Sequence, residues 1–305
     1  MSEAIKVAVR VRPFNARERE RGARCIVRMN GATTTILHPD SEESRAFTFD
    51  HSYWSHDGFE ADEAGYLRPA GDSSSYASQE HVFADLGTGL LDNAWAGYNV
   101  CLFAYGQTGS GKSYSVVGYG ENRGIVPLAC EEIFRRKAAQ ESDALQVHVT
   151  VSMLEIYNER IRDLLGDGKK QKEMNFSVQK DEVIGMMCPG LTSTGITDKE
   201  GAATAIALGN TNRSVGATNL NEQSSRSHMI VTLTVFSTSK VNGAQVTRRH
   251  RHRHLRHHRH HFLRRHFHLT PSSLPSRSTW ASCLSSTSRA RSASRRRAPA
   301  TTPSE

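Results

Sequence analysis

Cysteine is scarce in this sequence, and long hydrophobic runs are missing. The five cysteines include no Cys-x-x-Cys pair and no zinc-site spacing, which argues against a disulfide framework and favours a reducing, cytosolic compartment. Nowhere do about 18 apolar residues follow one another, so no membrane span is expected. The N-terminus also lacks the apolar run of a signal peptide. The sequence therefore predicts a soluble protein of the cytoplasm.

Acidic side chains are nearly absent from the end of the chain. Between Arg248 and Glu305 stand 14 arginines, no lysine and one acidic residue. This stretch therefore carries +13, whereas the whole chain carries +8 and the first 247 residues carry −5. Nine of the 15 histidines lie between His250 and His268. Few aliphatic residues remain there to bury a core, which predicts a basic, disordered tail over 246–305 and a folded domain over 1–245.

Apolar periodicity in the first 245 residues predicts alternating strands and helices. Residues 99–105 read as a buried strand that leads into a glycine-rich loop, and apolar residues recur with helical spacing over 78–95. Segment 58–75 is polar and aperiodic and reads as a solvated surface insertion. Strand-like pattern ends near Val246. Further strands are expected at 5–11, 46–50, 145–157 and 227–237, and further helices at 125–137 and 198–209.

The glycine-rich loop carries the clearest chemical signal. Residues 106–113 read Gly-Gln-Thr-Gly-Ser-Gly-Lys-Ser and match the pattern G-x-x-x-x-G-K-[ST] at every specified position. In such a loop, glycines let backbone N–H groups turn toward phosphate oxygens, Lys112 reaches the β- and γ-phosphates, and the Ser113 hydroxyl ligates Mg²⁺. An ordinary Gly/Ser turn is the alternative, but the position between a strand and a helix favours phosphate binding. We expect a nucleoside triphosphate and Mg²⁺ as ligands.

Four segments occur in one order and carry a family resemblance. They are Val7-Ala8-Val9-Arg10-Val11-Arg12-Pro13-Phe14, then 103–113 around the loop, then Glu155-Ile156-Tyr157-Asn158-Glu159, and finally Asn221-Glu222-Gln223-Ser224-Ser225-Arg226-Ser227-His228. Together they closely resemble the kinesin motor domain. Residues 52–56 and 97–101 look most like the vesicle-transporting kinesin-3 class. The resemblance extends over about residues 4–245.

The resemblance implies roles for residues around the nucleotide. Arg10, Arg12 and Pro13 match the segment that lies against the adenine in this family. Phe83 takes the place of an aromatic residue that stacks on the ring, although a plain core position is equally open for it. The nucleotide-binding residues expected in the loop and directly after it are Gly106, Gln107, Thr108, Gly109, Ser110, Gly111, Lys112, Ser113 and Tyr114.

Residues 221–228 match the family's switch I. There Asn221 and Ser225 approach the γ-phosphate and Mg²⁺ when a triphosphate is present, and Ser224 and Arg226 complete the predicted catalytic set. Ser113 and Ser225 are accordingly the predicted metal ligands. An ordinary polar loop is the alternative for 224–227. Glu155 is expected to have a structural role rather than a catalytic one.

The family's switch II, Asp-Leu-Ala-Gly-Ser-Glu, does not occur in the sequence. Phosphoryl transfer needs a second acidic group near Mg²⁺ and a sensor of the γ-phosphate, and Arg226 would pair with the Glu of this motif. The genetic code allows several codons for each of residues 280–293. Codons can be chosen so that the reading frame one nucleotide earlier encodes Gly-Lys-Leu-Ser-Leu, one apolar residue and Asp-Leu-Ala-Gly-Ser-Glu-Arg. We therefore interpret the tail as an out-of-frame extension. The alternatives are a basic arm for nucleic acid or an anionic membrane, and a His-x-His metal site.

The sequence predicts an α/β, three-layer P-loop NTPase fold with a mostly parallel central sheet flanked by helices, truncated before its last elements. The resemblance implies an ATP-dependent microtubule motor that uses ATP and Mg²⁺. It also implies tubulin as partner, the cytoplasm and its microtubule cytoskeleton as location, and no specific nucleic acid. Without switch II, we expect this chain to be impaired. The alternatives are a nucleotide-binding pseudo-motor that does not cycle, and a nucleic-acid or membrane binder acting through the basic tail.

Overall fold

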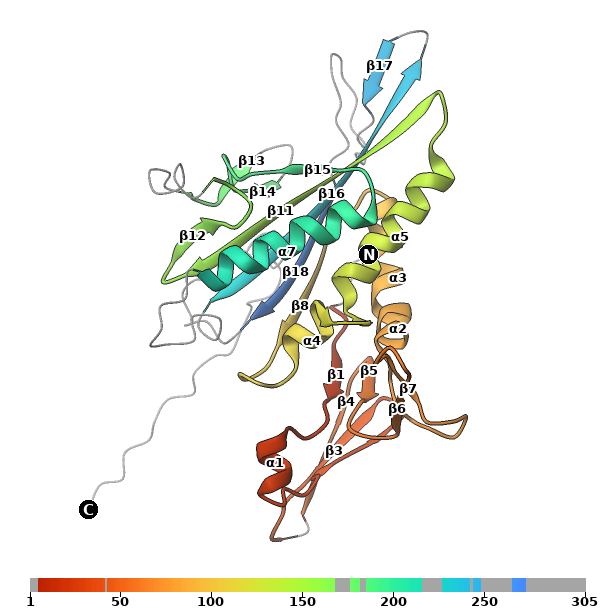
Figure 1. Ribbon diagram of the computed structural model, residues 1–305, viewed down its shortest axis with the longest axis vertical. Helices are drawn as coiled ribbons and strands as arrows, with labels where there is room; N and C mark the ends of the chain where they lie inside the picture. The colour runs from red at the N-terminus through yellow and green to blue at the C-terminus, as the bar shows by residue number, and fades with distance from the viewer. Residues whose placement is uncertain are drawn as a thin grey trace, which may run out of the picture. The chain divides into compact units, whose positions relative to one another are not determined.

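The computed structural model describes most of the chain up to Thr247 and a short segment beyond it (Figure 1). The described residues lie within one compact unit, Met1–Ser273. No helix in the described part is long and apolar enough to cross a membrane. The described residues are 5–41, 43–167, 176–181, 185–215, 227–241, 244–247 and 265–272.

The helices and strands that the sequence predicts are present, and short strands that it does not predict lie between them. The helix expected over 78–95 is continuous but passes through a π-helical turn, η1, in its middle. The helices are α1 (Ala16–Glu20), α2 (Gln79–Val82), η1 (Phe83–Gly87), α3 (Thr88–Trp95), α4 (Lys112–Val116), α5 (Ile125–Gln140) and α7 (Lys199–Val215). The strands before the glycine-rich loop are β1 (Ala8–Val11), β2 (Val27–Asn30), β3 (Thr33–Leu37), β4 (Ser44–Thr48), β5 (His51–Trp54), β6 (Phe59–Ala61), β7 (Leu67–Pro69) and β8 (Val100–Tyr105). Those after it are β9 (Gly118–Tyr119), β10 (Asn122–Arg123), β11 (Leu145–Tyr157), β12 (Arg160–Asp163), β13 (Gln179–Asp181), β14 (Gly185–Met187), β15 (Thr194–Ile196), β16 (His228–Val241), β17 (Ala244–Thr247) and β18 (Arg265–Ser272).

A central sheet holds the long strands in the order β12-β11-β16-β18-β8, with β15 beside β11 and β17 beside β16. β11 and β16 are rich in valine and threonine, which suit a pleated sheet. They pair along their lengths, from Leu145 opposite Ser239 to Ile156 opposite His228. The helices pack against these two long strands (Figure 1).

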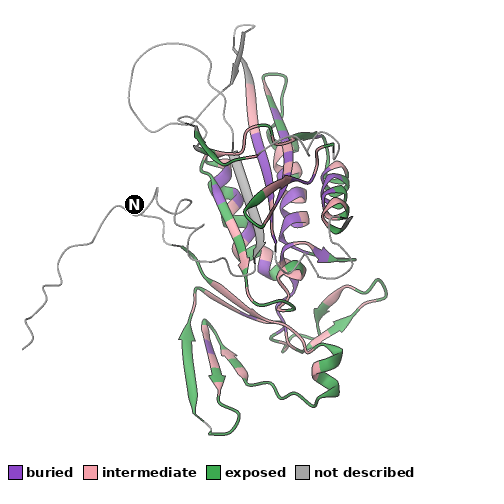
Figure 2. Cartoon of the chain, turned by 90° about the vertical axis from the view of Figure 1, so that its left-hand side faces the viewer, coloured by how far each residue is buried: buried purple, intermediate pink, exposed green. Residues whose placement is uncertain are grey.

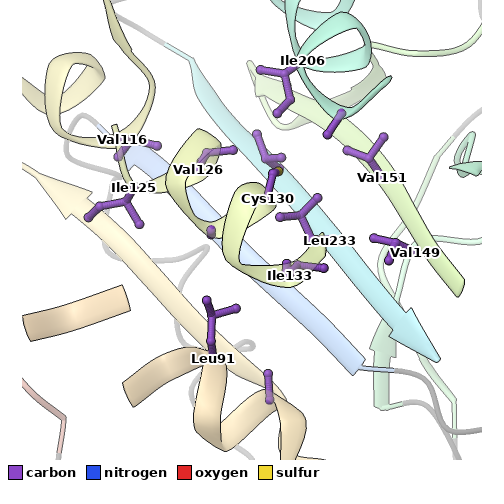
Figure 3. Close-up of a cluster of buried hydrophobic side chains, with 14 of the residues drawn as sticks. Leu91, Val116, Ile125, Val126, Cys130, Ile133, Val149, Val151, Ile206 and Leu233 are labelled. Carbon is purple, nitrogen blue, oxygen red and sulfur yellow. The ribbon is translucent and has the colours of Figure 1, made fainter. Parts of the chain in front are cut away.

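The main core lies between this sheet and the helices. Alternate residues of β11, among them Val149 and Val151, turn toward the helices and are buried, and Leu233 of β16 is fully buried beside them. From α5, Val126 and Ile133 meet these side chains (Figure 3). Figure 2 shows the buried residues gathered in the central strands and in the helices against them. Periodic apolar positions in the sequence thus became core positions.

The α/β class is confirmed, and the expected direction of the strands is corrected. Of the pairings in the central sheet, β8 with β18 is parallel, whereas β11 with β12, β15 and β16, and β16 with β17 and β18, are antiparallel. The described sheet is therefore mixed, not mostly parallel. The reason is that β12 returns beside β11 through a short turn, and that β15 and β16, which α7 connects, each pair with β11 in the opposite direction.

The described residues supply two of the three expected layers. Helices α3, α5 and α7 contact one another as well as the strands, so they form a single layer on one face. On the other face of β8, Cys101, Phe103 and Tyr105 are exposed. Phe103 and Tyr105 expose 57% and 65% of their surface, so the described residues leave this face of β8 open.

The segment 246–305 contributes a strand, contrary to the expectation that strand pattern ends near Val246. β18 lies between β16 and β8 and pairs with both, for example Phe267 with Val100 and Leu269 with Val231. The physical reason is that a gap between two strands offers unpaired backbone N–H and C=O groups, which any extended segment can satisfy without an apolar face of its own. Apart from 246–247 and β18, the tail lies outside the described residues, and its disorder stays a prediction.

The surface insertion 58–75 is more ordered than its composition suggests. It contains the antiparallel hairpin β6–β7, and Asn122 holds this hairpin from outside. The Asn122 amide accepts from the Leu67 N–H and donates to the Gly65 carbonyl oxygen, both at 2.8 Å. The expectation of an aperiodic loop was wrong here, because hydrogen bonds from a distant turn order the hairpin.

Candidate nucleotide-binding site

The glycine-rich loop joins the end of β8 to the start of α4, as the motif predicts. Gly111 stands directly before α4 with a φ of 91°, a left-handed conformation that glycine adopts without strain. Gly106 leaves no room for a side chain, because a Cβ there would lie 2.5 Å from Ser110 Oγ. The sequence therefore folds locally into a tight turn that presents its backbone.

Backbone N–H groups of this loop are open to a ligand. Within the described segments, the N–H groups of Gly109, Gly111 and Lys112 have no hydrogen-bond acceptor. The Lys112 ammonium folds over the same loop, where Nζ donates to the carbonyl oxygens of Gly106 at 2.7 Å and Gln107 at 2.8 Å. Its partial burial lowers the pKa of Lys112. A cation beside unpaired N–H donors is an arrangement that suits phosphate oxygens.

Ser113 is placed where the motif needs a metal ligand. It follows Lys112 in α4, is exposed, and forms no hydrogen bond through its hydroxyl with the described residues. Among the described His, Cys, Asp and Glu residues, no group of three or more could hold a metal ion. The Ser113 hydroxyl fits a Mg²⁺ ion bound at this loop, because Mg²⁺ prefers hard oxygen ligands such as hydroxyl, phosphate and water oxygens.

Arg12 connects the end of β1 with the glycine-rich loop. Its Nε donates to the Gly109 carbonyl oxygen at 2.6 Å, and its two terminal nitrogens donate to the two Glu18 carboxylate oxygens at 2.7 Å. The Arg12 hydrogen bond lowers the pKa of Glu18 to about 2. A cavity of about 270 Å³ opens at this point. Its lining includes Arg12, Phe14, His56, Gln107 and Ser110. Arg12 thus borders both loop and cavity, and its contact with an adenine, like that of neighbouring Pro13, stays a prediction.

Arg10 is surrounded by protein groups. Its guanidinium lies 5.3 Å from the centre of the Tyr114 ring, and burial lowers its pKa. Each of its nitrogens has at least one acceptor at 2.6 to 3.2 Å. These acceptors belong to Ser55, Ala77, Gln79 and Ser115. The structure therefore gives Arg10 a bracing position inside the protein, beside the predicted site residue Tyr114.

Phe83 packs against the hydrophobic core. Its ring lies on its own helix, because a Cβ at Gly87 would approach the Phe83 ring to 2.2 Å. This placement corresponds to the plain core position, which was one of the two alternatives for Phe83 in the sequence. The structure does not bring Phe83 into the lining of the cavity beside the loop.

The predicted switch I residues Asn221, Ser224, Ser225 and Arg226 lie outside the described residues. The described parts of the chain on either side of their segment are linked to each other. In the last turn of α7, Arg213 Nη2 donates to Ser227 Oγ at 3.0 Å, and Ser227 directly precedes β16.

The buried Glu155 balances the charge of Arg213. Arg213 Nε lies 3.2 Å from Glu155 Oε1, and the Glu155 side chain is fully buried. Burial and the nearby Arg213 charge lower the pKa of His228, the first residue of β16. An ion pair removed from water must have its partner, since an unpaired buried charge is costly. This placement agrees with the structural role expected for Glu155.

Sequence reasoning missed three residues that shape the site. Glu18, which pairs with Arg12, belongs to a capping box with Asn15, and the spacing Asn-x-x-Glu before α1 was a readable signal for it. Gln79 and Arg213 had no such signal, because their partners Tyr114 and Glu155 are distant in the sequence.

Comparisons with known proteins show the family of this chain. A family model described as the kinesin motor domain matches residues 10–255, ten residues beyond the Gln245 limit of the resemblance in the sequence. Kinesin-like protein KIF28 of Rattus norvegicus is 46% identical over 233 residues, covering 76% of this chain and 22% of that protein. Kinesin-like protein KIF1C of Homo sapiens is 43% identical over 234 residues, covering 75% and 20%. The chain thus spans about a fifth of the length of the curated relatives it matches.

Solved structures give the same answer. The structure of KIF14[391-755] with ADP in complex with a microtubule aligns with a TM-score of 0.70 at 35% identity, covering 92% of this chain and 71% of that one. The relatives include kinesin-3 members, which confirms the class suggested by the sequence. With a glycine-rich loop between a strand and a helix and a family model matching most of its length, this chain belongs to the kinesin motor domain family.

Proposed function

We propose that this chain binds Mg·ATP at the loop 106–113 and is the nucleotide-binding part of a microtubule motor. Kinesin motor domains are ATPases, and solved relatives hold ADP or AMP-PNP. The observation that carries the proposal is that the N–H groups of Gly109, Gly111 and Lys112 have no acceptor among the described residues, while the Lys112 ammonium folds over the same loop. Lys112 exchanges its contacts with two loop carbonyls for the β- and γ-phosphates, which attract a cation more strongly.

The remaining site residues take the roles that the family resemblance implies. Ser113 and Ser225 hold the Mg²⁺, which neutralises phosphate charge when bound. Asn221 and Ser225 approach the γ-phosphate, and Ser224 and Arg226 complete the catalytic set. Arg12 and Pro13 lie against the adenine, and Tyr114 belongs to the nucleotide-binding set. The cavity beside Arg12 supports this orientation of the nucleotide, because it lies next to the loop and on the side of β1.

Microtubules are the proposed partner, and the microtubule cytoskeleton of the cytoplasm is the proposed location. Two solved relatives, KIF14 with ADP and KIF14 with AMP-PNP, are complexes with a microtubule. We assign no specific nucleic-acid partner to the chain. Co-sedimentation with polymerised tubulin, with and without nucleotide, tests this assignment, and a chain that stays in the supernatant under both conditions contradicts it.

A second function, nucleotide binding without turnover, is favoured by one observation. The 305 residues contain no Asp-Leu-Ala-Gly-Ser-Glu segment, so the γ-phosphate sensor and the partner of Arg226 are lacking. We expect little microtubule-stimulated phosphate release from this chain. Robust stimulation by polymerised tubulin would show that other residues supply the acidic groups.

The substitution Lys112→Ala tests the nucleotide site directly. It removes the side-chain cation that the motif directs at the phosphates, so affinity for a fluorescent Mg·ATP analogue should fall on the order of a hundredfold. Lys199→Ala is the matched control, since Lys199 is 53% exposed and lies on α7. Equal affinity of the Lys112→Ala variant and the unmodified chain would refute the assignment.

A further inference from the structure

Helix α4 carries Lys112 and Ser113 but is only five residues long. A helix this short leaves most of its carbonyl groups without a partner in the helix. The Ser113 carbonyl oxygen accepts from the Val117 N–H at 2.8 Å. The next one, on Tyr114, accepts instead from a side chain outside the helix, the Gln79 amide, at 2.7 Å. The backbone directly after Ser113 is therefore fixed from α2.

Gln79 uses both ends of its amide and is almost fully buried, with 3% of its surface exposed. Nε2 donates to the carbonyl oxygens of Tyr114 and Asn122, the second at 3.2 Å. Oε1 accepts from Arg10 Nη1 at 2.6 Å. A single side chain thus joins β1, α2, α4 and the strand β10. Only an amide can donate to two carbonyls and accept from a guanidinium at once.

Arg10 completes the brace around α4. The same Nη1 that donates to Gln79 also donates to Ser115 Oγ at 3.1 Å, and the guanidinium packs over the Tyr114 ring. Two consecutive residues of α4 are held in this way, immediately after the two that the proposed function assigns to phosphate and Mg²⁺. Asn122, which also contacts Gln79, carries the brace outward to the hairpin β6–β7.

We propose that Gln79 is a positioning residue for the nucleotide: by holding the Tyr114 carbonyl, it sets where Lys112 and Ser113 meet the phosphates. This inference rests on the proposed function of the loop 106–113. Gln79 does not touch the nucleotide itself. A small displacement of groups that must meet a ligand together lowers affinity strongly, since their geometry is part of the binding free energy.

The substitution Gln79→Glu tests the role in the full chain. Glutamate keeps the size and the acceptor for Arg10, but it loses both donors and places a carboxylate beside the Tyr114 and Asn122 carbonyl oxygens. We expect the dissociation constant of a fluorescent Mg·ATP analogue to rise about tenfold. Gln146→Glu is the matched control, because Gln146 is an exposed glutamine on β11 and the charge change is the same.

Thermal unfolding with and without Mg·ATP separates positioning from folding. A residue that only supports the fold lowers both midpoints equally, whereas a positioning residue also shrinks the upward shift that the nucleotide causes. If Gln79→Glu does not fold, Gln79→Met, uncharged and of similar length, carries the same measurement. Equal affinity and an equal nucleotide-induced shift in the variant and the unmodified chain would overturn the role of Gln79. If the unmodified chain binds no nucleotide, the proposed function falls first and this role falls with it.

Discussion

The two neighbouring strands β8 and β18 lie side by side in one sheet but differ strongly in sequence. They pair in parallel, from Val100 opposite Phe267 to Tyr105 opposite Ser272. β8 reads Val-Cys-Leu-Phe-Ala-Tyr and leads into the glycine-rich loop 106–113. β18 reads Arg-His-Phe-His-Leu-Thr-Pro-Ser, contains a proline that central strands rarely accept, and leads into a stretch without acidic residues until Glu305.

This difference shows that the pairing of a strand in the sheet does not depend on the chemistry of the residues that follow it. Backbone hydrogen bonds admit β18 between β8 and β16, because both neighbours offer groups that need partners. The chemistry at the end of each strand depends on side chains, and only β8 leads into residues suited to a nucleotide. In the family that this chain resembles, Asp-Leu-Ala-Gly-Ser-Glu also stands after a strand. Lys-Leu-Ser-Leu, which the other reading frame encodes before that motif, alternates polar and apolar residues, a pattern typical of a strand.

Restoring the reading frame between about codons 246 and 280 should have the largest effect, because it replaces the sequence of β18 and of the residues after it. The restored chain gains the acidic residues of switch II and a partner for Arg226, so microtubule-stimulated phosphate release should rise on the order of a thousandfold or more. The measurement is phosphate release with and without polymerised tubulin.

Sequencing the transcript across codons 240 to 310 is the control for this prediction. If the adjacent frame holds no kinesin coding, the frameshift interpretation is wrong and the tail is a basic arm. Deleting residues 248–305 then distinguishes its use: a real arm loses salt-dependent binding to a polyanion such as heparin when its +13 charge is removed.

The other neighbour of β18 offers a stability test. Leu233 in β16 is fully buried within the core beneath α5, so Leu233→Ala should lower the free energy of unfolding by about 2–5 kcal/mol. Urea denaturation measures it as a lower midpoint with an unchanged slope. Leu208→Ala on α7, where the leucine is 49% exposed, should change stability by less than about 1 kcal/mol. Similar losses at both positions would mean that β16 does not lie over the main core.

The smallest expected effect concerns His228 at the start of β16. Its pKa is lowered from 6.5 by burial and by Arg213, so the unfolded chain takes up the proton more readily than the folded one. The stability that neutral His228 contributes is present above pH 6.5 and is lost as the pH falls through the folded pKa. Between pH 7.5 and 5.5, the unfolding midpoint should drop by about 1–2 °C more in the unmodified chain than in a His228→Asn variant. Calorimetry at both pH values measures this difference. Identical drops of the unfolding midpoint in the two proteins would mean that the His228 side chain is exposed to solvent.

The sequence by itself determined the family and the long elements, and it predicted a phosphate-binding loop. Residues 106–113 are contiguous, and their chemistry is local, so a pattern of eight positions is enough to identify them. Helix α5 and strands β8, β11 and β16 also followed from apolar spacing, because burial of one face is written into the order of residues.

Only the tertiary structure decided which side chains hold that loop in place. The braces around it join distant parts of the chain: Arg10 to Ser115, Gln79 to Tyr114 and Arg12 to Gly109. It likewise decided the strand directions and the placing of β18. No local pattern encodes these, because a buried polar group takes whichever partner the packed fold brings within hydrogen-bond distance, and that choice depends on the whole arrangement of elements.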